Sequence, residues 1–120
     1  MKLKVGIASH AQMKARSLAI AKGEVTPQPS DTKVWFNSIE SFAKVLSERN
    51  RELLAIISRS HPQSLSELET LSGRAKPNLS RTLHTMARYG LVDLKKGARG
   101  AVVATAKYDQ VELAVDLTAA

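Results

Sequence analysis

The sequence predicts an α+β fold in which a group of helices is followed by a β-hairpin. Apolar residues recur at helical spacing between residues 47 and 89, where a turn containing glycine separates two short helical patterns. A basic segment with glycines at its centre follows, flanked by two strand-like runs. Apolar and polar residues alternate around residues 3–7 and 111–117. This order predicts a winged helix-turn-helix domain with a C-terminal strand over residues 37–120, preceded by a strand-helix extension and linker over residues 1–36.

Composition limits the classes of protein that this chain can be. With 120 residues, 43% of them hydrophobic but only 4% aromatic, it can form a compact fold with a mainly aliphatic core. The absence of cysteine excludes disulfides and thiolate metal sites. No apolar run approaches the roughly 18 residues that a membrane span needs, and no signal-peptide pattern opens the chain. We therefore expect a cytoplasmic protein with no membrane partner.

Positive charge is concentrated in one part of the chain. The formal net charge is +7, which suits a polyanionic partner. Seven Lys and Arg residues but only one acid, Asp93, lie between Arg74 and Arg99. A solvated basic surface would have the same composition, but the concentration of charge on one helix and one hairpin favours a nucleic acid.

The N-terminal extension is expected to form a strand followed by a helix. Alternation over residues 3–7 predicts the strand. Ser9 and Gln12 have the spacing of a capping box that opens a helix over His10–Lys22, and Gly23 suits its left-handed end.

A linker, a strand and a short helix are expected next. Two prolines make Thr26–Thr32 a linker, and Lys33–Phe36 is a short strand. Asn37 with Glu40 can cap a helix that runs through Leu46.

Capping signals then predict two further helices. Ser47 opens one that ends at His61–Pro62, with a buried stripe made of Leu53, Leu54, Ile56 and Ile57. Ser64 and Glu67 form a second capping box, and Gly73 ends the short helix that follows. Its inward side chains are expected to be Leu65, Leu68 and Leu71.

The last part of the chain predicts one helix and three strands. Pro77 suits the first turn of the helix, which runs to Tyr89 and ends at Gly90. The strands are expected at Leu91–Lys96, at Ala101–Lys107 after the turn Gly97–Gly100, and at Val111–Leu117, which should have one buried face.

The helix over residues 77–89 has two chemically distinct faces. At about 100° per residue, Leu79, Leu83 and Met86 share one face. The opposite face, its flanks and the N-terminal end, where backbone N–H groups can meet a phosphate, comprise Lys76, Pro77, Asn78, Ser80, Arg81, His84, Thr85 and Arg88. Arginine can bond a guanine edge, asparagine an adenine edge, and serine or threonine either bases or phosphates. We therefore predict that this helix enters the DNA major groove.

Several of these side chains also have a structural explanation. Ser80 and Thr85 suit any solvated helix, and Asn78 can satisfy the first helical turn. His84 has no second ligand at metal spacing, so a surface imidazole explains it better than a metal site. Arg81 and Arg88 carry the prediction, because a cationic face with no intervening acid is unusual for a merely solvated surface.

The hairpin carries a second basic cluster, formed by Lys95, Lys96 and Arg99. An arginine at the tip, next to glycine, can approach the minor groove, where narrow A·T tracts attract positive charge. The alternative is that the lysines only protect a strand edge from pairing. The neighbouring helix favours DNA.

No pattern in the sequence predicts catalysis. Both phosphate-loop signatures, G-x-x-x-x-G-K-[ST] and G-x-G-x-x-G, are missing, and the three histidines are isolated. Capping explains Glu67 better than acid-base chemistry does. We expect a protein that is not an enzyme and that uses no cofactor or metal.

The chain resembles prokaryotic winged-helix regulators of the MarR/ArsR type, and more narrowly a family of small DNA-binding antitoxin regulators. The segments that carry the resemblance are R-x-L-L-x-x-I (Arg51–Ile57), S-L-S-E-L (Ser64–Leu68), K-P-N-L-S-R-T-L (Lys76–Leu83) and Y-G-L-V (Tyr89–Val92). The resemblance implies sequence-specific binding of double-stranded DNA by a homodimer, with a toxin encoded nearby as a further partner. It also implies that Lys76–Arg88 is the recognition helix and Lys95–Arg99 the wing.

The predicted function is transcriptional regulation, with a dimeric repressor on a two-fold-symmetric operator. The apolar N-terminal segment and the strand over Val111–Leu117 are candidate dimer surfaces, although both can equally close the sheet of one monomer. The main alternative is a winged helix that binds a protein such as a toxin and has little DNA affinity. RNA binding is a weaker alternative, because the basic surface lacks an aromatic stacking platform.

Overall fold

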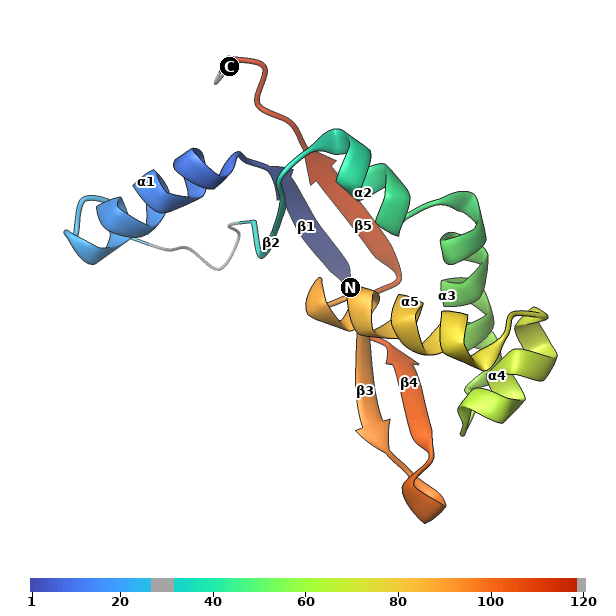
Figure 1. Cartoon of the computed structure of the whole chain (residues 1–120). Coiled ribbons are helices and arrows are strands. Elements are labelled where there is room, and N and C mark those ends of the chain that lie inside the picture. Colours follow the sequence, from blue (N-terminus) through green and yellow to red (C-terminus); the bar gives the residue numbers. More distant parts are fainter. Residues whose placement is uncertain (27–31, 119–120) are drawn as a thin grey trace. The chain divides into compact units, whose positions relative to one another are not determined.

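A computed structural model describes residues 1–26 and 32–118, and these residues form an α+β fold, as predicted (Figure 1). The elements are β1 (Lys2–Ile7), α1 (His10–Ala21), β2 (Val34–Phe36), α2 (Ile39–Val45), α3 (Glu48–Ser60), α4 (Leu65–Ser72), α5 (Lys76–Arg88), β3 (Val92–Lys96), the 3-10 turn η1 (Ala98–Gly100), β4 (Val102–Ala106) and β5 (Gln110–Ala114). The order α3–α4–α5–β3–β4 is compatible with a winged helix. Most of the linker expected at Thr26–Thr32 lies outside the described residues. No helix in the described part of the chain is long and apolar enough to cross a bilayer.

The described residues form two compact units. The helix-hairpin unit comprises Met1 and Lys44–Asp109, and the sheet unit comprises the described parts of Lys2–Ala43 and Gln110–Ala120. This division differs from the boundary expected between residues 36 and 37. The reason is that β5 pairs with β1 in the sheet unit, whereas β3 and β4 pair only with each other among the described strands.

Aliphatic side chains form the core of the helix-hairpin unit. Helix α3 packs against α4 and β4, and α5 packs against α4 and β3. Each fully buried aliphatic side chain contributes about 1.5–3 kcal/mol relative to an exposed one. The buried residues are Val45, Leu53, Ile57, Pro62, Leu68, Leu79, Leu83, Met86, Leu91, Val92 and Ala104.

The structure confirms most of the predicted helix ends. Ser9 makes both hydrogen bonds of its capping box. The hydroxyls of Ser47 and Ser64 accept hydrogen bonds from backbone N–H groups three residues later, over 3.3 and 3.1 Å. Gly73 ends α4 with φ 73°, and His61 ends α3 with φ 47°, so both adopt the left-handed conformation that closes a helix.

The predicted cap of α2 was wrong by one residue. The hydroxyl of Ser38, not the side chain of Asn37, accepts a hydrogen bond from the Ser41 N–H over 3.1 Å. Asn37 lies one residue too early for that role, and its side-chain oxygen accepts a hydrogen bond from the Ser41 hydroxyl instead.

Three further expectations about helices α3 and α4 need correction. In a capping box the Glu67 carboxylate would accept a hydrogen bond from the Ser64 N–H. It accepts one from the Gln63 N–H instead, over 3.0 Å. Leu71 is 47% exposed, because the short helix α4 buries only a narrow stripe centred on Leu68. In α3, Leu53 and Ile57 are buried, whereas the other two members of the expected stripe, at positions 54 and 56, are half-buried.

The sheet unit is built on a parallel sheet in which β1 lies between β2 and β5 (Figure 1). Leu3 and Val5 of β1 are buried, as is Phe36 of β2. The Phe36 ring makes an edge-to-face contact with Phe42 of α2, with ring centroids 5.3 Å apart.

Gly6 lies beside the indole of Trp35, its partner across β1 and β2. A Cβ atom at Gly6 would be 2.5 Å from Cζ3 of Trp35, so only glycine fits without displacing the ring. The Arg16 guanidinium of α1 lies 5.9 Å from the centroid of the same indole, a cation–π contact.

The final strand does not have the buried face that its alternating sequence predicted. Leu113 is 37% exposed, Val115 40% and Leu117 89%, and Val111 is half-buried. The strand ends at Ala114, earlier than predicted, so Val115 and Leu117 lie beyond it, and β5 is an edge strand with β1 at the centre of the sheet. Strand β5 therefore forms one edge of the sheet, and apolar side chains in it and after it stay exposed.

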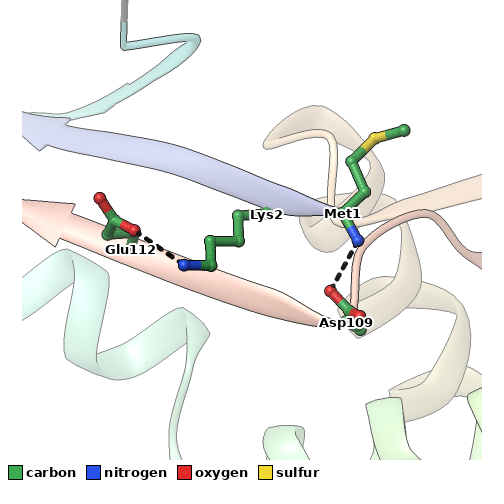
Figure 2. Close-up of polar contacts among 4 residues, drawn as sticks. All are labelled: Met1, Lys2, Asp109 and Glu112. Atoms are coloured by element: carbon green, nitrogen blue, oxygen red, sulfur yellow. Dashed lines mark hydrogen bonds and ion pairs between the residues drawn. The ribbon is translucent and has the colours of Figure 1, made fainter. Parts of the chain in front are cut away.

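Charges near the two ends of the chain pair within each unit (Figure 2). In the helix-hairpin unit the N-terminal ammonium of Met1 lies 2.9 Å from Oδ1 of Asp109. In the sheet unit Nζ of Lys2 lies 3.7 Å from Oε2 of Glu112, between β1 and β5. Both pairs are solvent-exposed, so each contributes at most about 1 kcal/mol.

Candidate nucleic-acid interface

Helix α5 separates apolar from polar side chains as the sequence predicted. Leu79, Leu83 and Met86 are at most 1% exposed. No acidic residue occurs between Lys76 and Arg88. Burial of one whole face fixes the rotation of the helix, so the polar face points away from the core of this unit.

The structure places the predicted site residues of α5 on or beside its outer face. Lys76, Pro77, Asn78, Arg81, His84 and Arg88 are exposed, whereas Ser80 and Thr85 are half-buried. Pro77, Arg81, His84 and Arg88 are spaced by three or four residues and therefore share one side of the helix. Lys76 and Asn78 flank that side in the first turn. This surface presents several cationic and amide donors, the groups that bond base edges and phosphates.

The N-terminus of α5 differs from the sequence expectation. The Lys76 N–H donates to Oε2 of Glu69 over 3.2 Å, and Pro77 has no N–H. The carboxylate of Glu69 therefore occupies a position that was expected to be open to a phosphate.

Two side chains of the outer face bond back to the helix itself. Nδ1 of His84 lies 2.7 Å from the Ser80 carbonyl oxygen. Because a carbonyl only accepts, this contact places the proton on Nδ1 and leaves Nε2 as the outward ring nitrogen. The Thr85 hydroxyl donates to the Arg81 carbonyl over 3.1 Å, which leaves its oxygen as an acceptor.

Arg74 is a structural and electrostatic residue that the sequence analysis did not single out. Its Nη1 donates to Oδ1 of Asn50 over 3.1 Å, and its Nη2 donates to the Thr82 hydroxyl over 3.0 Å. The guanidinium thus links α3 to α5. Partial burial, and secondly the charge of Arg49, lower the pKa of Arg74 from its ordinary value. Only its place in the Gly-containing turn before α5 could have signalled this role.

A pocket of about 600 Å³ lies beside α5 in the helix-hairpin unit. It is lined by Lys44, Val45, Arg49, Asn50, Gly73, Arg74, Ala75, Asn78, Arg81, Thr82, Thr85 and Met86. We call it the basic pocket, after its four cationic residues. Asn78, Arg81 and Thr85 were predicted site residues, whereas the contributions of Lys44 and Arg49 were not predicted.

The hairpin presents the second predicted cluster. Strands β3 and β4 are antiparallel, with Lys96 opposite Val102. Arg99 adopts the left-handed conformation, with φ 58°, in the turn between them. Lys95, Lys96 and Arg99 are exposed, and Nζ of Lys95 lies 3.8 Å from Oδ2 of Asp93. The tip therefore carries accessible positive charge.

Gly97 explains the tight turn at the hairpin tip. A Cβ atom there would be 2.7 Å from Cγ2 of Val103, and the Gly97 N–H donates to the Ala101 carbonyl over 2.6 Å. Glycine therefore lets the two strands close on each other and fixes the place of Arg99. Within the described parts of the chain, no group of three or more His, Asp or Glu side chains could hold a metal ion.

Comparisons with known proteins place the chain in a family. A search of the curated proteins finds no match. A crystal structure of the predicted DNA-binding transcriptional regulator from E. coli is 22% identical, with a TM-score of 0.47, and the match covers 84% of this chain and 86% of that one. The model of the family HVO_A0114 matches residues 45–113, more than half of the chain. The chain therefore belongs to the HVO_A0114 family.

Proposed function

We propose that this protein is a sequence-specific regulator of transcription that binds double-stranded DNA through a winged helix-turn-helix. The observation that carries the proposal is the two-sided character of α5. Leu79, Leu83 and Met86 anchor one face in the core, and the opposite face exposes cations without an acid. An α-helix of this kind fits the B-DNA major groove, which is about 12 Å wide.

In this proposal different side chains of α5 contact different groups of the DNA. Arg81 and Arg88 reach guanine edges or phosphates, because a guanidinium donates two parallel hydrogen bonds to either. Asn78 is exposed in the first turn and meets an adenine edge in this proposal, because an amide can donate and accept a hydrogen bond there. His84 offers Nε2, since its Nδ1 is engaged with its own helix.

The hairpin acts as the wing. Arg99 and Lys96 are exposed at its tip, and an arginine there is drawn to the negative potential of a narrow minor groove. Lys95 contributes less, because Asp93 already offsets part of its charge.

We further propose that the protein acts as a homodimeric repressor on a two-fold-symmetric site. The exposed apolar side chains of β5 and of the residues after it, Leu113, Val115 and Leu117, supply a surface that a second copy would cover. A repressor needs only to occupy its operator, and two copies would occupy two half-sites about 34–36 Å apart. A toxin partner stays a prediction from the resemblance to small antitoxin regulators.

Selection of bound sites from a random pool of double-stranded DNA tests the proposal. We expect enrichment of a palindromic consensus, because a two-fold dimer reads two inverted half-sites. A parallel selection with the double variant Arg81→Ala/Arg88→Ala should not enrich that consensus. Failure of the folded wild-type protein to enrich any sequence would contradict the proposal and favour the protein-binding alternative.

A further inference from the structure

The basic pocket gathers four cations, and only one of them, Arg81, takes part in the base contacts proposed for α5. Lys44 and Arg49 of its lining are exposed, and Arg74 is half-buried. Arg81 also lines it, from the polar side of α5. None of the described residues that line the pocket is aspartate or glutamate. Its positive charge is therefore not neutralised from within.

Arg74 is held in a fixed orientation by neutral partners. Asn50 and Thr82 accept one hydrogen bond each from its two terminal nitrogens. Neither acceptor carries charge, and a guanidinium has five N–H donors, so Arg74 keeps its full charge and further donors. Asn50 is itself fixed, because its Nδ2 donates to the Val45 carbonyl over 3.0 Å. The site is thus organised before any ligand arrives.

Clustering of like charges without a counter-charge costs free energy, and an anion in the pocket would remove that cost. Arg49 lies close enough for its charge to disfavour the protonated form of Arg74. Arginine side chains bond phosphate oxygens in pairs, which adds geometric selectivity for a tetrahedral oxyanion. The pocket volume of about 600 Å³ is ample for a small phosphorylated molecule.

We propose that the basic pocket is a binding site for a phosphate group, held by Arg49, Arg74, Arg81 and Lys44. The phosphate belongs either to a small free anion or to the DNA backbone beside the recognition site. Arg81 belongs to both the pocket and the outer face of α5, so a free anion would compete with DNA for it. Only the DNA source rests on the proposed function, because a free anion can bind whether or not α5 reads DNA.

Calorimetric titration with pyrophosphate, in buffer of low ionic strength that contains no other multivalent anion, tests the pocket without DNA. We expect saturable binding of one pyrophosphate per chain to the wild type, weakened about 10-fold or more in Arg49→Ala, because a charge-assisted hydrogen bond is lost. The matched control is Arg51→Ala, which removes the same charge from an exposed position of the same helix outside the pocket. It should bind like the wild type.

A second experiment distinguishes the two sources. It measures the affinity of Arg49→Ala and Arg51→Ala for a selected DNA site at several salt concentrations. If the backbone supplies the phosphate, Arg49→Ala alone binds DNA more weakly, and the slope of log K against log[salt] falls by about 0.9. If a free anion is the ligand, DNA affinity is unchanged in Arg49→Ala, and inhibition of DNA binding by pyrophosphate needs about 10-fold more pyrophosphate for Arg49→Ala than for the wild type.

The proposal is overturned if folded Arg49→Ala and Arg51→Ala respond alike in both experiments. It is equally overturned if the wild type binds neither pyrophosphate nor DNA in a way that depends on Arg49. Failure of DNA binding alone would count against the proposed function and leave the pyrophosphate result to decide the pocket.

Discussion

Single side chains determine where positive charge is held in this molecule. The Arg74 guanidinium donates hydrogen bonds to Asn50 and Thr82 and so links α3 to α5. Arg81 and Arg88, in contrast, are exposed. The sequence alone identified the exposed pair, because helical spacing places them opposite a leucine face. It did not identify the structural role of Arg74, because the two residues that Arg74 bonds lie 24 positions before and 8 positions after it in the chain.

Replacement of Arg74 by alanine should destabilise the helix-hairpin unit by about 1–2 kcal/mol, because two acceptors lose a charged donor. Chemical denaturation followed by circular dichroism measures this change. Arg51→Ala, at an exposed position of α3, should stay within about 0.5 kcal/mol of the wild type. Equal stabilities of the two variants would show that the Arg74 contacts contribute nothing.

Gly6 offers a second test at the residue scale. Gly6→Ala should destabilise the protein by about 1–3 kcal/mol, because the new methyl group overlaps the Trp35 ring. The same substitution in a Trp35→Leu background should cost less, because the ring atoms that the new methyl group overlaps are gone. A denaturation-based double-mutant cycle measures that difference, and perfect additivity would mean that the two side chains do not interact.

At the scale of elements, the sequence predicted the ends of helices well. It did not predict which side chains other elements of the fold cover. Capping serines and Gly73 are recognised through bonds to residues three or four positions away, so the sequence holds both partners of each bond. Leu71 and the alternating residues of β5 were misjudged because periodicity shows that an element has an apolar side but not what covers that side. The basic pocket was missed for the same reason, since four separate segments supply its lining.

The wing gives a test at this scale. Arg99→Ala should lower affinity for a selected DNA site about 10-fold and reduce the salt slope by about 1, because one contact to the minor groove or a phosphate is lost. Lys95→Ala should have a smaller effect, because Asp93 shares its charge. Fluorescence anisotropy at several salt concentrations measures both. Equal or absent effects would favour a hairpin that only protects a strand edge.

The exposed residues after β5 test the dimer. Val115→Asp/Leu117→Asp should shift the protein from dimer to monomer at micromolar concentration, because a charge in an apolar interface is costly to desolvate. Sedimentation velocity measures the shift, with circular dichroism as the check that the fold is kept. A dimer unaffected by both charges would place the interface on another surface.

At the scale of the whole molecule, strands from opposite ends of the sequence pair with each other. Strand β5 pairs with β1 over the register Lys2–Gln110 to Gly6–Ala114, more than 100 residues apart in sequence. No local pattern reports such a pairing, so the expected boundary between residues 36 and 37 could not take it into account. The net charge of +7, in contrast, is a property of the sequence and favours a polyanionic partner whichever way the chain divides.

DNA binding by α5 is tested most directly by the salt-dependent affinity of Arg81→Ala/Arg88→Ala for a selected site. The matched control is Arg51→Ala/Arg59→Ala, which removes the same charge from exposed positions of α3. We expect the α5 variant to lose at least about 10-fold in affinity per arginine and to show a shallower salt slope, while the control keeps most of its affinity. Unchanged affinity and slope in a folded Arg81→Ala/Arg88→Ala protein would contradict the assignment of α5 as the recognition helix.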